Sequence, residues 1–573
     1  MNITHPIKKG NAGMALLTAL IFITVTVLVL TAMTARYVQQ RLVVDRFEDY
    51  YVCFEAAEAA IEQGRVALLS YDFDFRVGIP ESWEPDFDDN NNLIMPSLDD
   101  DGIVPASFHS VPEVEYIVYV HEWYEDGRDT NGDGTIDSDA EMGFFSIHAL
   151  AGMNGHTRQI EAVYSSHDIG VWRNAIFAGS GQAGGLINGN VSVAGSVHLL
   201  GEDLPAGGMA VSALDMSGTS LIHNNYDGIP ANLGARVPPL NTTIVDGEEV
   251  PTLEATLRVK NGLVGLSGNS MVGEPPSAGA KRTMDGVFVN DGWTGNSTVD
   301  GVPTMVFSDN SWEEQYDLGN RVGFPVLSDY WRDPEGNLVH NPNTGDWYTH
   351  EEYFTEQLAG QTYEGDVVID AASSDEFYFN VDTGEYEHLP PEQAGSPEER
   401  AARLAEIQAR HEAGENSIFK PADSDKLYIN GQIKIDGDLI FTGQGNQRTL
   451  HYEGRAALFV TGDVTIDANL LTYDVGPAAF PVNNCLGIMT PNNMMVGGSA
   501  QLSIMGAFYA EQQISTQRQT NVMGTFVSNY FNMGTNVPSI FQVPTLADNL
   551  PLGMIGNYPI LNMRSESWRE IGV

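Results

Sequence analysis

The chain has 573 residues, of which 77 are acidic and 28 are Lys or Arg, so its formal net charge at neutral pH is −49. This length predicts two to four structural units. The hydrophobic fraction of 42% is high enough for folded cores and excludes a disordered chain. So acidic a body repels nucleic acid and anionic membrane surfaces, and we expect no nucleic acid partner.

An uncharged segment near the start of the chain predicts a membrane-spanning helix. Residues 10–35 contain no charged side chain, and about 20 apolar residues are enough to cross a bilayer. Lys8 and Lys9 precede the segment, which predicts a cytoplasmic N-terminus and an exported body. The apolar core of a cleavable secretion signal is only about 7–15 residues long. We therefore expect the span to be retained.

The residues after the span predict that the same helix continues to about residue 70. Apolar side chains recur seven apart, with a second set three residues later, which indicates a helix that packs one stripe on a globular body. The two sets are Phe47, Phe54, Ile61 and Leu68, and Tyr50, Ala57, Gly64 and Tyr71.

This N-terminal region resembles the PilX N-terminal family of type IV pilus minor pilins. The resemblance rests on "MALLTALIFITVTVLVLTAM" after Gly13 and on "FEAAEAAIEQGRVAL" from Phe54, and it covers about the first 70 residues. It implies that a prepilin peptidase cuts after Gly13 and that Met14 becomes a methylated N-terminus. Gly10 is a poorer alternative cleavage site.

One departure from most major pilins concerns Thr18. Most major pilins carry a glutamate at the fifth mature position, where it offsets the N-terminal ammonium of a neighbouring subunit, and Thr18 occupies that position here. A lone carboxylate in hydrocarbon is costly without such a partner. Since a subunit at the filament tip has no neighbour beyond it, and since PilX-like and GspK-like tip subunits also lack the acid, we expect a tip location. The alternative is an anchored protein in which Thr18 is an ordinary span residue.

Residues 111–165 predict an antiparallel meander. "VEYIVYVHEW", "FFSIHALAG" and "TRQIEAVYS" read as strands, and "MNGH" reads as a turn. A helix packed on such a sheet is the pilin-like arrangement that the resemblance implies.

The loop between the first two of these strands, "DTNGDGTIDSDAE", has the spacing of a calcium-binding loop. Oxygen ligands at alternate positions around a sharp Gly134 turn suit calcium, although position 12 is Ala140. We predict a structural calcium site, with an acidic loop that binds no metal as the alternative. The predicted ligands are Asp129, Asn131, Asp133, Thr135 through its carbonyl, Asp137, and Asp139 or Glu141.

Beyond residue 169 the chain predicts stacked short strands. "IDGDLIF" at Ile435 is echoed 25 residues later by "VTGDVTI", and "MGAFYA" at Met505 is echoed 18 residues later by "MGTFVS". Repeats of this kind favour a β-solenoid, and a Gly-rich β-sandwich is the alternative.

Residues 311–425 interrupt these repeats and predict a partly helical surface insertion. "HEEYFTEQLAG" and "SPEERAARLAEIQARHEAGE" read as helices. In the second, Ser396, Pro397 and Glu399 form a start signal, and Leu404 and Ile407 leave a thin apolar stripe.

The two cysteines, Cys53 and Cys485, exclude a disulfide framework. We predict two unpaired thiols, since one lies in the helix near the membrane and the other near the far end of the chain. A disulfide in an oxidising compartment is the alternative.

The predicted fold class is α+β, mostly β. The predicted divisions are a leader (1–13), the transmembrane and stalk helix (14–70), a pilin-like sheet domain (71–168), a β-rich, solenoid region (169–310), the insertion (311–425) and a second β-rich, solenoid region (426–573).

We expect no catalysis. "HEEYF" and "HEAGE" lack the second histidine of a zinc protease, and no nucleophile elbow, P-loop or dinucleotide fingerprint occurs.

The expected function is that of a tip-located minor pilin that primes assembly or contacts surfaces. Its expected partners are other minor and major pilins, the prepilin peptidase, the inner membrane before assembly, and a surface glycan or other surface. We expect a single-pass inner membrane protein that moves to the pilus or cell surface, with its body periplasmic or extracellular. The alternatives are a membrane-anchored adhesin or carbohydrate-binding protein and, less favoured, a glycan-cleaving solenoid enzyme.

Overall fold

The chain forms two compact units. The first comprises Met1–His167 and Asn562–Val573, and the second comprises Asp168–Leu561. A computed structural model describes residues 12–70, 86–87, 93–94, 115–124, 144–153, 156–180, 187–189, 191–202, 204, 211–245, 247–299, 301–333, 338–358, 362–380, 385–534, 538–556 and 561–571.

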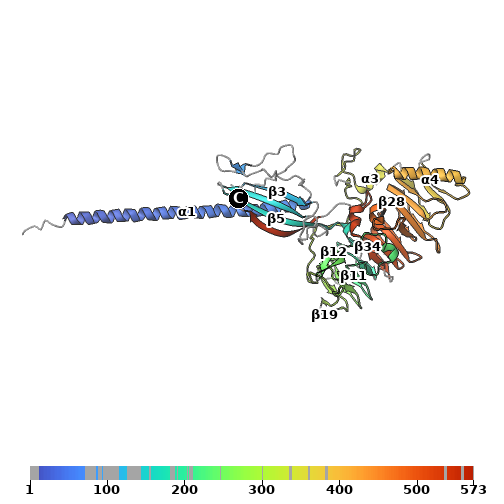
Figure 1. Ribbon diagram of the computed structural model, residues 1–573, viewed down its shortest axis with the longest axis horizontal. Coiled ribbons are helices and arrows are strands. Elements are labelled where there is room, and N and C mark those ends of the chain that lie inside the picture. Colours follow the sequence, from blue (N-terminus) through green and yellow to red (C-terminus); the bar gives the residue numbers. More distant parts are fainter. Residues whose placement is uncertain are drawn as a thin grey trace, which may run out of the picture. The chain divides into compact units, whose positions relative to one another are not determined.

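The first unit combines one long helix with a four-stranded sheet. Helix α1 (Ala12–Ser70) is a single uninterrupted element (Figure 1). The sheet has the order β3–β4–β5–β36, and a separate short pair joins β1 (Asp86–Phe87) to β2 (Leu93–Ile94). The sheet strands are β3 (Glu115–Tyr124), β4 (Phe144–Met153), β5 (His156–Asp168) and β36 (Leu561–Ile571). Both β3–β4 and β4–β5 are antiparallel, which confirms the predicted meander.

The last strand, β36, differs from the expected division of the chain. Residues 426–573 were expected to form one β-rich region, but β36 completes the sheet of the first unit instead. The whole second unit is therefore inserted between β5 and β36, two neighbouring strands of one sheet. No repeat links "LNMRSESWREI" to the residues before it, and a sheet partner some 400 residues away leaves no local sequence signal.

The C-terminal half of α1 packs on this sheet through small side chains. Its buried residues recur at the spacing of one helical face, and they meet apolar residues of β4, β5 and β36. Alanines at the contact let the helix approach the sheet closely. The buried helix residues are Cys53, Ala56, Ala57, Ala60, Ile61 and Gly64, and the sheet residues are Ile147, Ala149, Ala151, Ile160, Ala162, Tyr164 and Met563.

The predicted stripe on α1 is correct in part. Ala57, Ile61 and Gly64 are buried as expected, but Phe47 is 70% exposed and Phe54 is only half-buried. A strict seven-residue repeat drifts around a straight helix, which has 3.6 residues per turn. The side chains of Leu68 and Tyr71 lie outside the described residues.

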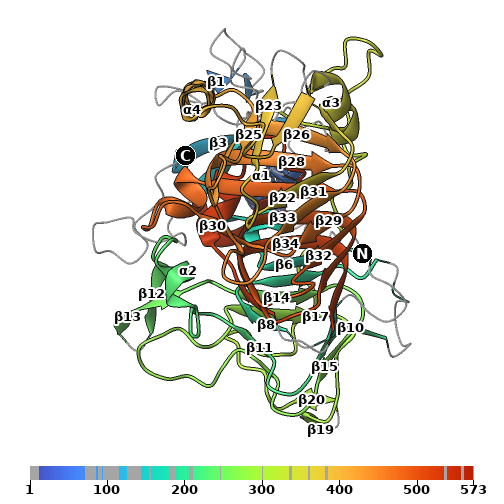
Figure 2. The ribbon, with the colours of Figure 1, turned by 90° about the vertical axis from the view of Figure 1, so that its right-hand side faces the viewer.

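The second unit is built mainly from three parallel ladders of short strands, which run side by side along one stack (Figure 2). Ladder A has the order β21 (Thr362–Glu364), β26 (Lys426–Asp436), β28 (Thr449–Val460), β31 (Cys485–Thr490), β33 (Leu502–Thr516), β34 (Thr520–Gly534), β6 (Ile176–Ala178), β9 (Val197–Leu199), β14 (Thr256–Val259) and β17 (Gly286–Val289).

Ladders B and C share the long strands with ladder A. Ladder B has the order β22 (Val367–Asp370), β27 (Leu439–Thr442), β29 (Val464–Ile466), β32 (Asn493–Val496), the later parts of β33 and β34, β7 (Ile187–Gly189), β10 (Ser212–Met216), β15 (Leu263–Leu266) and β18 (Trp293–Thr294). Ladder C has the order of the first part of β28, β30 (Asn469–Thr472), the first parts of β33 and β34, β35 (Ser539–Phe541), β8 (Ser192–Ala194), β11 (Leu221–His223) and β16 (Met271–Val272).

Shorter elements decorate these ladders. Strand β25 (Ser417–Phe419) pairs antiparallel with β26. The hairpins are β12 (Asn241–Val245) with β13 (Glu248–Thr252), β19 (Thr298–Val299) with β20 (Val302–Pro303), and β23 (Glu376–Asn380) with β24 (Glu385–Leu389). The helices are α2 (Ala231–Gly234), α3 (His350–Gln357) and α4 (Pro397–Glu412).

The order of rungs in the stack is not the order of the chain. Strands from residues 362–541 stack sequentially, and the last of them, β34 and β35, pair with β6 and β8 from residues 176–194. Strands from 197–294 then continue the stack away from this junction. Figure 2 shows the orange and red rungs of the later segment next to the green rungs of the earlier one.

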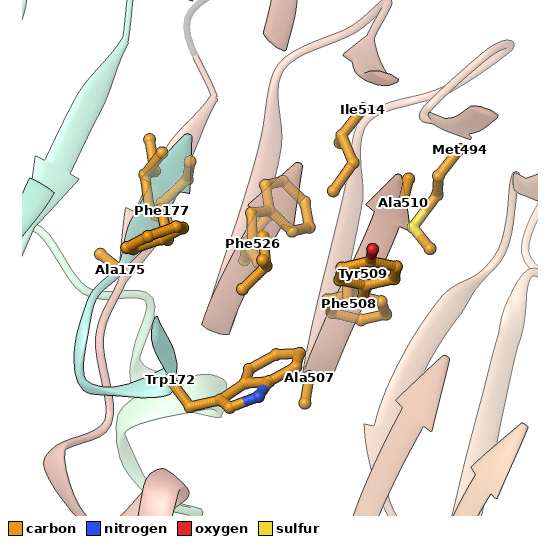
Figure 3. Close-up of a cluster of buried hydrophobic side chains, with 14 of the residues drawn as sticks. Trp172, Ala175, Phe177, Met494, Ala507, Phe508, Tyr509, Ala510, Ile514 and Phe526 are labelled. Carbon is orange, nitrogen blue, oxygen red and sulfur yellow. The ribbon is translucent and has the colours of Figure 1, made fainter. Parts of the chain in front are cut away.

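Each rung contributes apolar side chains to one continuous core. In ladder A the fully buried inward residues include Phe508 and Phe526, whose rings meet edge to face at 5.5 Å. Ile176, which pairs with Phe526 across the junction, is also fully buried, so the core is continuous there. Figure 3 shows Phe508 and Phe526 with the neighbouring buried side chain Phe177.

The echoed segments lie in register on neighbouring parallel strands. Ile435 pairs with Val460 and Leu439 with Val464, at the predicted shift of 25 residues. Met505 pairs with Met523 at the predicted shift of 18. This parallel pairing does not fit the alternative of a β-sandwich, whose sheets are antiparallel.

Residues 316–333 and 338–358 cover the outward side of ladder A, and we call these two described stretches together the strap. Phe324 stacks near Phe177 and Tyr509, with ring centroids 6.4 and 5.8 Å away, and Phe354 packs 5.0 Å from Phe459. The structure thus differs from the expected surface insertion at 311–425. The strap buries apolar side chains, and β21 and β22 form a rung of the stack.

The predicted helices in this region are confirmed. Helix α4 begins with the expected capping box of Ser396 and Glu399, with Pro397 in the first turn. Leu404 and Ile407 pack with Phe419 and Tyr428.

We predict that Ala60→Glu destabilises the first unit by at least about 3 kcal/mol, because it buries an unpaired charge between α1 and the sheet. Hydrogen exchange in β4, measured by mass spectrometry on the detergent-solubilised chain, should accelerate. The neighbouring Ala59→Glu change places the same charge on the exposed side of α1 and should leave exchange unchanged. Equal effects of the two changes would contradict the described packing.

We predict that Gly524→Ala lowers stability by about 2–3 kcal/mol. Gly524 has φ +135°, and a Cβ atom there would lie 1.9 Å from the Gly506 carbonyl oxygen on the next rung. Gly476 has φ +150° but open space around it, so Gly476→Ala controls for backbone strain alone. Calorimetry should show a lower unfolding temperature for the Gly524 variant than for the control.

Candidate functional site: the apolar half of α1

The N-terminal half of α1 is an exposed apolar rod. Every described side chain from Met14 to Glu48 is exposed. Residues 12–35 carry no charge and rise about 36 Å along the helix axis, against about 30 Å of hydrocarbon in a bilayer. Among the described residues, α1 alone is long and apolar enough to cross a membrane. Exposed large side chains in this half include Met14, Leu17, Leu20, Phe22, Leu28, Leu30 and Met33.

The threonines of this half satisfy their own hydroxyl groups. Thr18 Oγ1 donates to the carbonyl oxygen of Met14 at 2.8 Å, and the other threonines donate to the residue four earlier in the same way. A hydroxyl bonded within its own helix can enter hydrocarbon at little cost. Thr18 therefore leaves no unpaired polar group on the rod. The other threonines are Thr24, Thr26, Thr31 and Thr34.

The first charged side chains of α1 come after the uncharged segment, and the residues that pack on the sheet come after those. Arg36, Arg41 and Arg46 lie on exposed turns. Tyr50 then meets the Arg158 guanidinium, which lies 4.1 Å from its ring centroid, and this contact marks the start of the packed half. One helix thus passes from a fully exposed apolar half to a half that is fixed on a sheet.

The last strand helps to fix the packed half. Trp568 of β36 meets Phe54 of α1 edge to face at 5.6 Å. Arg569 bonds to Glu161 of β5, and Arg158 pairs with Glu570 at 2.6 Å. Sequence reasoning missed these residues, and the only signal was the weak alternation of "LNMRSESWREI".

Glu161 lies at the centre of a partly buried charged group. His148 Nε2 lies 3.3 Å from its carboxylate. His148 belongs to β4 and Arg569 to β36, the two strands that flank β5. Burial by itself would raise the pKa of Glu161, but the Arg569 hydrogen bond and the charge of His148 lower that pKa overall. The carboxylate therefore stays ionised and holds β36 to β5.

The predicted processing residues lie at the start of this rod. Gly13 is in the first turn of α1, and Met14 is 69% exposed. Residues 1–11 of the expected leader lie outside the described residues, so cleavage after Gly13 stays a prediction.

The predicted calcium loop also lies outside the described residues. This applies to Asp129, Asn131, Asp133, Thr135, Asp137, Asp139 and Glu141. Within the ranges that the structure describes, no three His, Cys, Asp or Glu side chains are grouped to hold a metal ion.

Neither cysteine forms a disulfide, and both are buried. Burial raises the pKa of Cys53 to about 11 and that of Cys485 to about 12, so both thiols stay protonated at neutral pH. Protonated buried thiols are poor nucleophiles and behave as small apolar side chains.

No protein-family model matches the chain. No curated protein matches it either. Among solved structures, the chain is similar to the competence-associated pilin ComZ from Thermus thermophilus. The TM-score is 0.44 and the identity 17%, with 91% of this chain and 97% of that chain covered.

Proposed function

We propose that this protein is a minor subunit of a type IV pilus. The observation that carries the proposal is α1, whose exposed apolar half continues without a break into a half packed on an antiparallel sheet. The apolar half would lie in the inner membrane before assembly and among the helices of other pilins afterwards. The sheet would hold the packed half of the helix, and the folded units would face the periplasm or the outside of the cell.

Thr18 supports a position at the filament tip. A subunit within the shaft needs a carboxylate to neutralise the N-terminal ammonium of the next subunit, and Thr18 supplies only a hydroxyl that is already bonded to Met14. At the tip no such ammonium has to be neutralised. The inserted second unit would then project beyond the filament, where it can prime assembly or contact a surface.

We also infer that the second unit is a β-solenoid. The support is the in-register parallel pairing at the shifts of the sequence echoes, together with the repetition of three ladders along one stack. In this role the unit is a stiff body and needs no catalytic residues.

Mass spectrometry of the mature N-terminus tests the pilin proposal. We predict a chain that begins at Met14 and carries one added methyl group on its amino terminus. Gly13→Val should leave the leader attached, because a prepilin peptidase could no longer cut there. Ala15→Val is the control for a local change beyond the cut, and it should be processed normally. An intact Met1, or a cut near Ala35, would contradict the proposal.

We propose a structural calcium ion in the loop 129–141. Isothermal calorimetry on the full chain in detergent should detect calcium binding that Asp133→Ala abolishes. Asp126→Ala, just outside the predicted register, should bind normally. Identical heats for the wild type and Asp133→Ala would rule the site out.

A further inference from the structure

Charged side chains are nearly absent from two segments of the second unit. Residues 475–547 contain only Glu511 and Arg518, and residues 174–201 contain none. All but one of the 77 acidic residues of the chain therefore lie elsewhere. We call these two segments together the neutral belt.

The fold joins the two segments into one band. Strands β31, β33 and β34 of the first segment are consecutive rungs of ladder A, and β6 and β9 of the second segment follow them directly. The chain junction between β34 and β6 lies in the middle of the belt. A band of five rungs, whose only charged strand residue is Glu511 of β33, thus crosses a protein with a net charge of −49.

The stack itself does not demand this neutrality. Like charges on neighbouring strands repel, which disfavours them on stacked rungs. Elsewhere in the same stack, however, Asp366, Asp438 and Asp463 follow one another on three rungs. Each of the first two carboxylates accepts the backbone N–H of the next aspartate, at 3.0 and 2.8 Å. Since the fold tolerates a column of carboxylates, their absence from the belt requires another reason.

Ladder C presents to solvent a row of short polar side chains, of which Ser503, Asn521, Ser539 and Ser192 belong to the belt. On ladder A the strap covers the outward residues of the belt, such as Phe177 and Tyr509. On ladder C one outward residue from each of six successive rungs is partly exposed, and at about 4.8 Å per rung the row is about 24 Å long. The row comprises Thr449, Asn469, Ser503, Asn521, Ser539 and Ser192.

The chemistry of this row selects an uncharged partner that is rich in hydroxyl groups. Hydroxyl and amide groups both donate and accept hydrogen bonds. A polyanion would be repelled by the acidic residues on either side of the belt, and a polycation would be drawn to those residues rather than to the belt. We propose that ladder C binds a neutral glycan chain, which lies along the row of six residues. This inference names a partner for the surface contact in the proposed function, and it rests on that part of the proposed function alone.

The test is a binding measurement on the full chain in a detergent without a sugar headgroup. The probes are the neutral polymers dextran, galactomannan and xyloglucan, with anionic alginate for comparison, in affinity electrophoresis. We expect at least one neutral polymer to retard the protein and alginate to have no effect.

Two double variants assign the binding to ladder C. Ser503→Ala with Asn521→Ala removes polar groups from the row and should weaken binding at least tenfold. The matched control is Thr465→Ala with Ser515→Ala, two partly exposed outward residues of ladder B, and it should change binding less than twofold. Circular dichroism on all variants separates lost contacts from lost folding.

Several results would overturn the glycan proposal. They are no retardation by any neutral polymer, binding to alginate of equal strength, or equal losses in the two double variants. A concentration-dependent dimer that only the ladder C variant disrupts, without glycan binding, would assign the row to a second copy instead. Because these measurements need no filament, their failure would leave the N-terminal processing test unaffected.

Discussion

Helix α1 has to be compatible with two environments along one unbroken backbone, one that surrounds its exposed apolar half and one formed by the sheet. Its N-terminal half keeps every described side chain exposed, uses no charge before Arg36 and bonds each threonine hydroxyl internally. Its C-terminal half is rich in alanine and buries one face against β4, β5 and β36. Because the helix has no break, what the apolar half binds is coupled mechanically to the sheet. The pilin proposal depends on this coupling more than on any side chain.

The insertion of the second unit between two neighbouring strands has a physical consequence. A load on the inserted unit reaches the sheet through both β5 and β36, and ion pairs of Glu161 and Arg158 hold β36 in place. The stack is also protected from pairing with other chains at the β17 edge. There Asn310 accepts from the Val287 N–H and donates to the Val287 carbonyl oxygen, as a neighbouring strand would. Contact with a partner is therefore left to the open ladder surfaces.

Local and periodic features of the fold were predictable from the sequence. The long helix, the three-stranded meander, the capping box at Ser396 and the register of both echoes depend on residues close in the chain or on repeated motifs. The place of β36 and the junction of β34 with β6 could not be predicted from the sequence, because the paired strands lie hundreds of residues apart and share no motif. Phe47 was expected in the packed stripe but is exposed, because a strict seven-residue repeat drifts around a straight helix. At the candidate site, the apolar rod and Thr18 were read from the sequence, whereas Trp568 and Arg569 were visible only once the sheet was known.

Immunogold electron microscopy of sheared filaments, with antibodies against the second unit, tests the account most directly. If α1 is an assembly helix and Thr18 marks a terminal subunit, gold should label one end of the filaments and leave the shaft bare. Labelling that stays with the membrane fraction and never appears on filaments would contradict the account, and labelling along the whole shaft would contradict the role assigned to Thr18.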